Sequence, residues 1–136
     1  MRAAVISVLH GISYGLAIDL STSADVRICA KDTRFSVKEV DIGLAADIGT
    51  LARLPKVVGN SSWVKEVCLS AREFGADEAL AVGFVSQVHA SKAAALDAAL
   101  RLAGLIASKS PVAVQGTKEL LNHARDNTVE QSTFLP

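Results

Sequence analysis

The chain has 136 residues, and its 14 Lys and Arg residues balance 14 Asp and Glu residues, which leaves a formal net charge of zero. Half of the residues are hydrophobic, but only 4% are aromatic. This composition excludes a disordered chain, and the lack of a basic excess argues against binding to nucleic acid or to a membrane surface. No apolar run reaches about 18 residues, so no membrane-spanning helix is predicted. The length fits one domain.

The first half of the chain is predicted to contain short strands and one helix. Residues 3–9 form an apolar, β-branched run that indicates a buried strand and not a signal peptide, because His10 and Gly11 end it early. The further elements expected here are a tight connection over 11–15, a helix over 16–24, strands over 27–30 and 34–37 around a turn, a loop over 38–49 and a short helix over 48–54 that ends near Pro55.

The second half is predicted to be mostly helical. The expected elements are a helix over 61–69 capped by Ser61, a helix from Asp77 to Gly83, a strand over 84–88, a long helix capped by Ser91 and a helix over 111–125 that begins with Ser110 and Pro111. A buried stripe at helical spacing is expected in the long helix, formed by Leu96, Ala99, Leu100, Ala103 and Ile106. Residues 128–136 carry no strong signal and are expected to fray.

The two cysteines, Cys29 and Cys68, lie far apart in the sequence and match no metal-ligand spacing. We expect both to remain reduced and to pack as small apolar residues in a reducing compartment.

A first candidate for chemistry is the sequence Gly-Ile-Ser-Tyr-Gly at residues 11–15, which fits the G-x-S-x-G pattern of a nucleophile elbow between a strand and a helix. Such an elbow would expose the Ser13 hydroxyl, and His89 or His123 would have to complete the triad with an acid. The alternative is that two glycines simply allow a tight turn. Because the motif is short and both histidines lie at ordinary helix-flanking or surface positions, we favour the turn.

A second candidate is a set of three acidic residues among apolar neighbours, Asp19, Glu39 and Asp47. A carboxylate in such surroundings loses hydration, and two that converge on one cleft could remove a proton at one carbon and return it at another. The alternative is structural: Asp47 caps the following helix, Glu39 is a solvated loop residue, and Asp19 pairs with Arg27 or Arg53. Spacing alone favours this structural alternative.

A third feature is the start of the helix after Gly15, where backbone N–H groups have no partner within the helix. Such groups can bind an anion or a developing oxyanion. Because every strand–glycine–helix turn offers them, this feature permits such a site without indicating one.

Taken together, several segments resemble the crotonase (enoyl-CoA hydratase/isomerase) superfamily. The segments are HG at 10–11, GLAID at 15–19, SADVRICA at 23–30, FSVKEVDIGLAADIGTL at 35–51, RLPKVVG at 53–59, ADEAL at 76–80, GFVS at 83–86 and SKSPVAV at 108–114. The run over 35–51 is most similar to the Δ3,5-Δ2,4-dienoyl-CoA isomerases within that superfamily.

The resemblance implies an α/β crotonase-like (ClpP/crotonase) fold, a spiral of β-β-α units, of which residues 1–136 would form a partial domain. The N-terminal part of such a domain and its C-terminal helices would be missing. Members usually assemble as trimers or pairs of trimers, so a homotrimer or homohexamer is expected. The family also implies a peroxisome or a mitochondrion, although we find no targeting signal in the chain itself.

The resemblance also implies an isomerase of fatty acid β-oxidation that shifts the conjugated double bonds of a fatty dienoyl-CoA from the 3,5 to the 2,4 positions. Glu39 matches the catalytic glutamate that acts beside the thioester, Asp47 the acid for the far end of the diene, and Asp19 a third acid of the pocket. Leu16, after Gly15, would supply a backbone N–H for the thioester oxygen. The reaction needs no metal or redox cofactor. Coenzyme A is part of the substrate. An enoyl-CoA hydratase and a catalytically inactive assembly module remain the alternatives.

Overall fold

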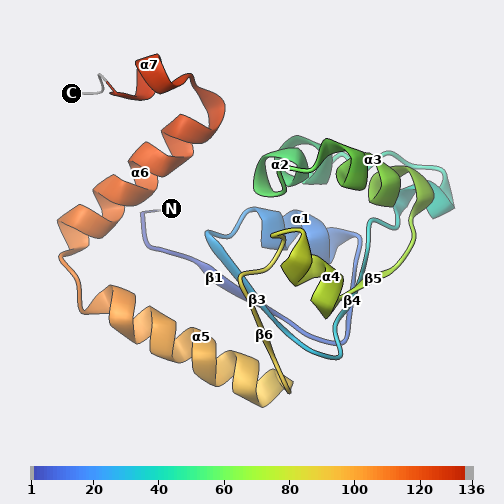
Figure 1. Ribbon diagram of the computed structural model, residues 1–136, viewed down its shortest axis with the longest axis horizontal. Coiled ribbons are helices and arrows are strands. Elements are labelled where there is room, and N and C mark those ends of the chain that lie inside the picture. The colour runs from blue at the N-terminus through green and yellow to red at the C-terminus, as the bar shows by residue number, and fades with distance from the viewer. Residues whose placement is uncertain (1, 134–136) are drawn as a thin grey trace. The chain divides into compact units, whose positions relative to one another are not determined.

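The computed structural model describes residues 2–133, and the chain divides into two units (Figure 1). The larger unit comprises residues 5–100, and the other combines residues 1–4 with residues 101–136. Within the described residues, no helix is both long enough and apolar enough to cross a membrane.

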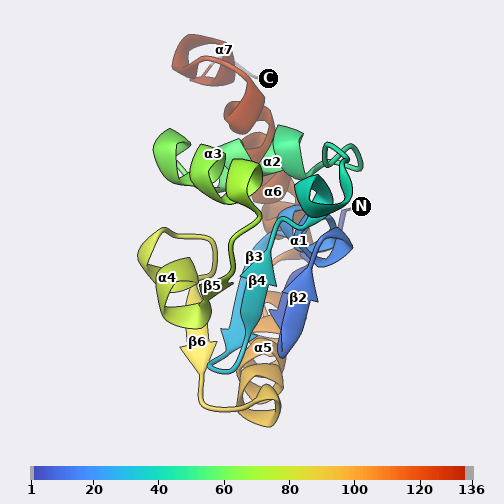
Figure 2. The same ribbon diagram turned by 90° about the vertical axis from the view of Figure 1, so that its right-hand side faces the viewer.

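Two three-stranded sheets form the centre of the larger unit (Figure 2). The first sheet is entirely parallel and consists, in spatial order, of β1 (Ile6–Leu9), β3 (Val26–Ala30) and β6 (Gln87–His89). The second consists of β2 (Ile12–Tyr14), β4 (Arg34–Ser36) and β5 (Phe74–Gly75), with β2 and β4 parallel and β5 antiparallel to β4. The turn between β3 and β4 therefore leads the chain from one sheet into the other.

Both units contain helices. The larger unit contains α1 (Leu16–Thr22), the short 3-10 helix η1 (Glu39–Ile42), α2 (Thr50–Val57), α3 (Ser61–Ser70), α4 (Ala76–Ala81) and the first part of α5 (Lys92–Ala107). The other unit contains the end of α5, then α6 (Pro111–Asp126) and α7 (Val129–Thr133). Figure 1 shows α5, α6 and α7 in orange to red.

An aromatic cluster lies at the centre of the larger unit. Phe35 on β4 stacks on Phe74 of β5 at 5.1 Å between ring centroids, and Phe84 meets Phe35 edge-on at 5.4 Å. Trp63 on α3 meets Phe74 edge-on at 4.9 Å. These are favoured aromatic geometries, and they connect the second sheet to α3 and to the segment that follows α4. Although the sequence has few aromatic residues, four of them lie together in one core.

Three expectations for the first half need correction. The expected connection over 11–15 contains β2, because Ser13 and its neighbours pair in register with β4. The expected loop over 38–49 contains η1. The helix α2 continues past Pro55, since the Val58 N–H still donates to the Leu54 carbonyl oxygen at 2.9 Å.

Three boundaries in the second half also differ from the prediction. Asn60, and not Ser61, is the N-cap of α3, and its side-chain oxygen accepts a backbone N–H at 3.0 Å. Asp77 lies inside α4 and makes no capping bond. The strand expected to begin at Phe84 begins only at residue 87, because the Phe84 N–H donates to the Ala79 carbonyl oxygen near the end of α4.

The long helix α5 is buried along a different line from the predicted stripe. Its buried residues are Ala95, Ala98 and Ala99, whereas Leu96 is 46% and Leu100 is 61% exposed. Alanine side chains are small, so the backbone of α5 can lie close to the elements it packs on, and the two leucines point away from that contact. Only Ala99 of the first three predicted positions is buried.

The caps predicted at the two C-terminal helices are confirmed. Ser91 Oγ accepts the Ala94 N–H at 3.1 Å, and Ser110 Oγ accepts the Ala113 N–H at 3.4 Å, with Pro111 in the first turn of α6. The segment expected to fray contains the short helix α7, and the rest of it, residues 134–136, lies outside the described residues.

Candidate functional site

The turn between β2 and α1 is built on Gly15. Its φ of 53° lies in the region that favours glycine, and its N–H donates to the Ser36 carbonyl oxygen of β4 at 3.0 Å. The chain then enters α1 at Leu16, whose N–H has no hydrogen-bond acceptor within residues 2–133. The first N–H groups of a helix have no partner inside it, so this donor is available to a ligand.

Glu39 begins η1, and its carboxylate lies directly against Gly15. A Cβ built on Gly15 would stand only 3.2 Å from Glu39 Oε1, so the missing side chain makes room for the carboxylate. Glu39 Oε2 is buried and has no hydrogen-bond partner within the described part of the chain. The residue as a whole is half-buried, which rules out the expected alternative of a solvated loop residue. A buried polar atom without a hydrogen-bond partner is uncommon, which makes Glu39 a candidate for contact with a ligand.

Asp19 lies on the buried side of α1 and is only 2% exposed. Its Oδ1 accepts the N–H of Thr50, the first residue of α2, at 2.7 Å. The predicted pairing of its carboxylate with Arg27 or Arg53 is not observed. Arg53 donates instead to the Asp19 main-chain oxygen at 2.8 Å, and Arg27 donates to carbonyl oxygens, the Phe84 oxygen among them. The side chain of Asp19 therefore caps a neighbouring helix.

Asp47 lies in the turn just before α2, and its side chain is exposed. It makes no hydrogen bond or ion pair with any residue between 2 and 133, so the carboxylate is available to a ligand. The expected alternative, in which Asp47 caps the following helix, is wrong because α2 begins at Thr50 and its N-cap is Gly49. The acceptor for the first N–H of α2 is Asp19, which lies far away in the sequence.

The alternative in which Ser13 is a nucleophile, which the sequence did not favour, is wrong. Ser13 is only 4% exposed, lies within β2 opposite Phe35, and donates a weak hydrogen bond to the His10 carbonyl oxygen at 3.4 Å. A nucleophile elbow needs an exposed hydroxyl with a base beside it. Of the two histidines considered, His89 interacts with Gln87 at 2.9 Å. The glycines of this motif serve the turn.

Sequence reasoning considered Arg53 only as a partner of the Asp19 carboxylate and missed its contact with Gly49. The guanidinium of Arg53 lies on Gly49 and against α1, and so connects α2 to both. The spacing could have revealed it, because residues four apart on a helix lie on the same face and Arg53 follows Gly49 by four positions.

The described residues contain no group of three His, Cys, Asp or Glu side chains that could hold a metal ion. Cys29 and Cys68 are buried free thiols, as expected. Burial raises the pKa of the Cys29 thiol, and burial together with the negative charge of Glu39 raises the pKa of the Cys68 thiol. Both groups therefore stay protonated and serve as packing residues.

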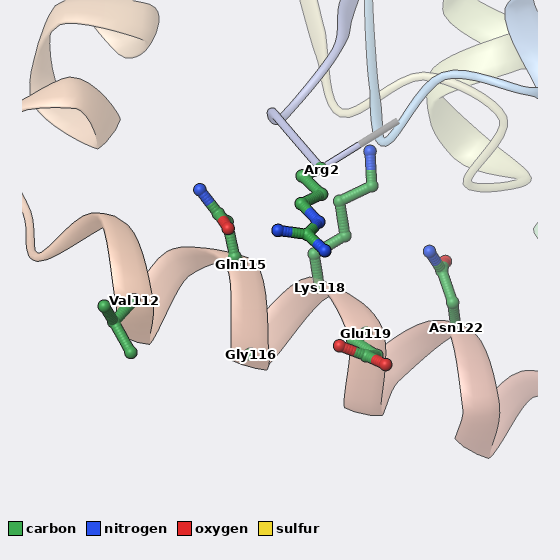
Figure 3. Close-up of a pocket in the computed structure, with 7 residues that line it drawn as sticks. All are labelled: Arg2, Val112, Gln115, Gly116, Lys118, Glu119 and Asn122. Atoms are coloured by element: carbon green, nitrogen blue, oxygen red, sulfur yellow. The ribbon is translucent and has the colours of Figure 1, made fainter.

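The smaller unit contains a hollow of about 560 Å³ on one side of α6 (Figure 3). It is lined by Arg2, Val112, Gln115, Gly116, Lys118, Glu119 and Asn122. Lys118 Nζ donates to the Ala3 carbonyl oxygen at 2.8 Å, and this bond fastens α6 to the start of the chain. Asp19, Glu39 and Asp47 take no part in this hollow.

Comparison with known proteins places this arrangement in a family. Residues 1–134 match the family described as enoyl-CoA hydratase/isomerase. The chain is 56% identical over 128 residues to the human mitochondrial Delta(3,5)-Delta(2,4)-dienoyl-CoA isomerase, an alignment that covers 94% of this chain and 39% of that protein. It is 44% identical to the peroxisomal Delta(3,5)-Delta(2,4)-dienoyl-CoA isomerase of Arabidopsis thaliana, with 96% of this chain and 46% of that protein covered.

A solved structure agrees with these sequence matches. The crystal structure of an enoyl-CoA hydratase subunit from Geobacillus kaustophilus superimposes with a TM-score of 0.91 at 26% identity, covering 97% of this chain and 51% of that one. The chain thus spans about half, or less, of the length of the relatives it matches. On the family match and the fold together, the chain belongs to the enoyl-CoA hydratase/isomerase family and has part of the crotonase fold.

Proposed function

We propose that the chain carries the proton-transfer part of an isomerase that shifts the conjugated double bonds of a fatty dienoyl-CoA from the 3,5 to the 2,4 positions. One observation carries the proposal. The half-buried carboxylate of Glu39, whose Oε2 is buried without a partner among the described residues, lies against Gly15, one residue before the available N–H of Leu16. Relatives named Delta(3,5)-Delta(2,4)-dienoyl-CoA isomerase support it.

The reaction moves one proton off the acyl chain and another onto it. Glu39, as the carboxylate, takes a proton from the carbon next to the thioester, and the electron pair spreads along the diene onto the thioester oxygen. Asp47, as the protonated acid, then gives its proton to the far end of the diene and becomes the carboxylate. The Leu16 N–H donates to the oxygen while it is negative; losing one such donor commonly costs about 10²–10³ in rate. One proton leaves and one arrives, so no redox partner is needed.

The residues differ in how well they suit these steps. Glu39 Oε2 is buried and Oε1 lies against Gly15, the residue before the Leu16 donor, which suits the end of the substrate where the charge develops. Asp47 is exposed and bonded to nothing within the described residues, which suits a group that meets the substrate from outside. The assignment of Asp19 to the pocket remains a prediction from the resemblance. The same holds for the homotrimer or homohexamer and for the mitochondrion or peroxisome.

The test is an ultraviolet assay of the 136-residue chain with a 3,5-dienoyl-CoA, beside Glu39→Gln and Asp47→Asn. The matched control is Asp41→Asn, which removes an exposed carboxylate of the same segment that is bonded to Lys38. Turnover that is lost in the first two variants and kept in the control supports the isomerase.

Other outcomes point to the alternatives. Addition of water to an enoyl-CoA without a diene shift would indicate a hydratase. Binding of an acyl-CoA without turnover would indicate a recognisable but incomplete site. Neither binding nor turnover would favour the non-catalytic assembly module.

A further inference from the structure

We propose that Arg53 is a positioning residue, which fixes the turn over 47–49 and thereby aims the carboxylate of Asp47. The inference deepens the proposed function and rests on it for the role of Asp47. It depends on the contacts of one guanidinium group with Gly49 and with α1, and on the burial of Ala46, which holds the turn at its other end.

The first contact is with Gly49. A Cβ at this position would stand 2.2 Å from Arg53 Nη1, 2.3 Å from Nη2 and 2.4 Å from Cζ, so the guanidinium occupies the space of a side chain at residue 49. The φ of Gly49 is 147°, a value that L side chains rarely adopt. The Arg53 N–H also donates to the Gly49 carbonyl oxygen at 2.9 Å. The side chain and the backbone of Arg53 therefore hold the same glycine.

The second contact is with α1. Arg53 Nη2 donates to the Asp19 main-chain oxygen at 2.8 Å, and Nε donates to Thr22 Oγ1 at 3.2 Å. Both α1 residues are only 2% exposed, so these acceptors lie on a packed and rigid element. The Asp19 carboxylate adds a bond of 2.7 Å to the Thr50 N–H. Helix α1 therefore holds both the start of α2 and the guanidinium that lies on Gly49.

The position of Asp47 depends on its backbone, because its side chain makes no hydrogen bond or ion pair with the described residues. Before it, Ala46 is 7% exposed and belongs to the hydrophobic core. After it, Gly49 is held by Arg53. The backbone is thus held on both sides of Asp47, which fixes the position from which its carboxylate extends. A lysine at residue 53 has no planar fork, so it cannot reach the two α1 acceptors from separate nitrogens and cover Gly49 at the same time.

The experiment compares the wild-type chain with Arg53→Met, Arg53→Lys and the matched control Lys65→Met, which removes one exposed positive charge on α3. Two readouts do not require turnover: hydrogen exchange of the amides over 47–53, and the NMR chemical shift of the Asp47 carboxyl carbon. We expect faster exchange and a changed shift in Arg53→Met, an intermediate result in Arg53→Lys and wild-type values in the control.

The kinetic readout is the split between kcat and substrate affinity. If the turn moves by about 1 Å, kcat for the diene shift falls by about 10²-fold in Arg53→Met. The acyl-CoA Kd stays close to the wild-type value, because Arg53 has no place in binding the thioester. Gly49→Ala places a Cβ where the guanidinium lies and is expected to act in the same direction, which keeps the test available if Arg53→Met fails to fold.

The outcomes separate this inference from the proposed function. Exchange and chemical shift that remain at wild-type values in Arg53→Met and Gly49→Ala overturn the positioning role. A displaced turn with unchanged kcat overturns its link to catalysis. A wild-type chain without diene turnover, but with a turn that loosens in Arg53→Met, contradicts the proposed function and leaves the structural role of Arg53 supported.

Discussion

The larger unit and the helices that follow residue 100 are stabilised in different ways. In residues 5–100, each of the helices α1 to α4 buries side chains, and an aromatic contact between Trp63 and Phe74 joins α3 to the second sheet. By contrast, α6 and α7 have no buried residue in the described part of the chain, and α6 begins with a local cap. Packed elements that meet from distant parts of a sequence can position side chains precisely enough for chemistry, whereas a capped helix mainly holds its own backbone.

The strongest way to break this comparison is to remove a ring from the core. Phe84 is fully buried and touches Phe35 and Phe74, so Phe84→Ala should lower the free energy of unfolding by about 3–5 kcal/mol. The partner variant Leu121→Ala, at a residue of α6 that is 67% exposed, should change it by less than about 0.5 kcal/mol. Urea denaturation measures both values. Similar losses in the two variants would mean that α6 is packed as tightly as the core.

The same contrast explains which parts of the fold were predictable from sequence. The cap at Ser110 and Pro111 and the strand that ends at Leu9 follow from neighbouring residues, and both were predicted. The three-residue strand β2 was missed, because its pairing with β4 is a long-range contact and its sequence fits a turn motif. Local signals therefore located most elements and misplaced those that depend on distant partners.

For the site, the chemistry of single residues was easier to predict than their contacts. The apolar neighbours of Glu39 indicated a candidate for proton transfer, and the resemblance to the family favoured a catalytic role over a structural one. Its approach to Gly15 needed the fold, because two segments more than twenty residues apart must meet. The capping of Thr50 by Asp19 was missed for the same reason, since capping rules consider only nearby residues.

The next largest effect is expected at that long-range cap. Asp19→Ala removes the acceptor of the Thr50 N–H and leaves a buried donor without a partner, which should cost about 1–3 kcal/mol. Asp19→Asn keeps an oxygen that can accept this bond, so its cost should be smaller. Denaturation of both variants, with amide exchange at Thr50, checks the order. Equal losses would show that the charge of Asp19 matters more than its hydrogen bond.

A local cap should have a smaller and more confined effect. Ser110→Ala removes the acceptor of the Ala113 N–H and should cost about 1 kcal/mol, and Ser110→Gly only a few tenths. Hydrogen exchange should rise in the first turn of α6 while the amides around Phe84 keep their protection. Loss of protection in both places would contradict the view that α6 is stabilised locally.

The smallest effect is expected at an ion pair on the surface of the larger unit, and it should depend on pH. Arg72 donates to Glu78 Oε1 at 2.6 Å, and each side chain is about one third exposed. The bonds from Arg72, with a further bond from Trp63 Nε1, lower the pKa of Glu78 below its ordinary value of 4.5. Because the folded-state pKa is the lower one, the stabilisation is fully present above pH 4.5 and is lost as the pH falls through the folded-state pKa.

The variant Glu78→Gln isolates the charge, because its amide oxygen can still accept the Trp63 N–H. At pH 7 it should be less stable than the wild type by at most about 1 kcal/mol, as is typical of exposed pairs. The difference should shrink steadily once the pH is below 4.5, where the wild-type carboxylate takes up its proton. A difference that persists in acid would have to come from packing of the side chain, and the pair would then belong with the core and not with the surface.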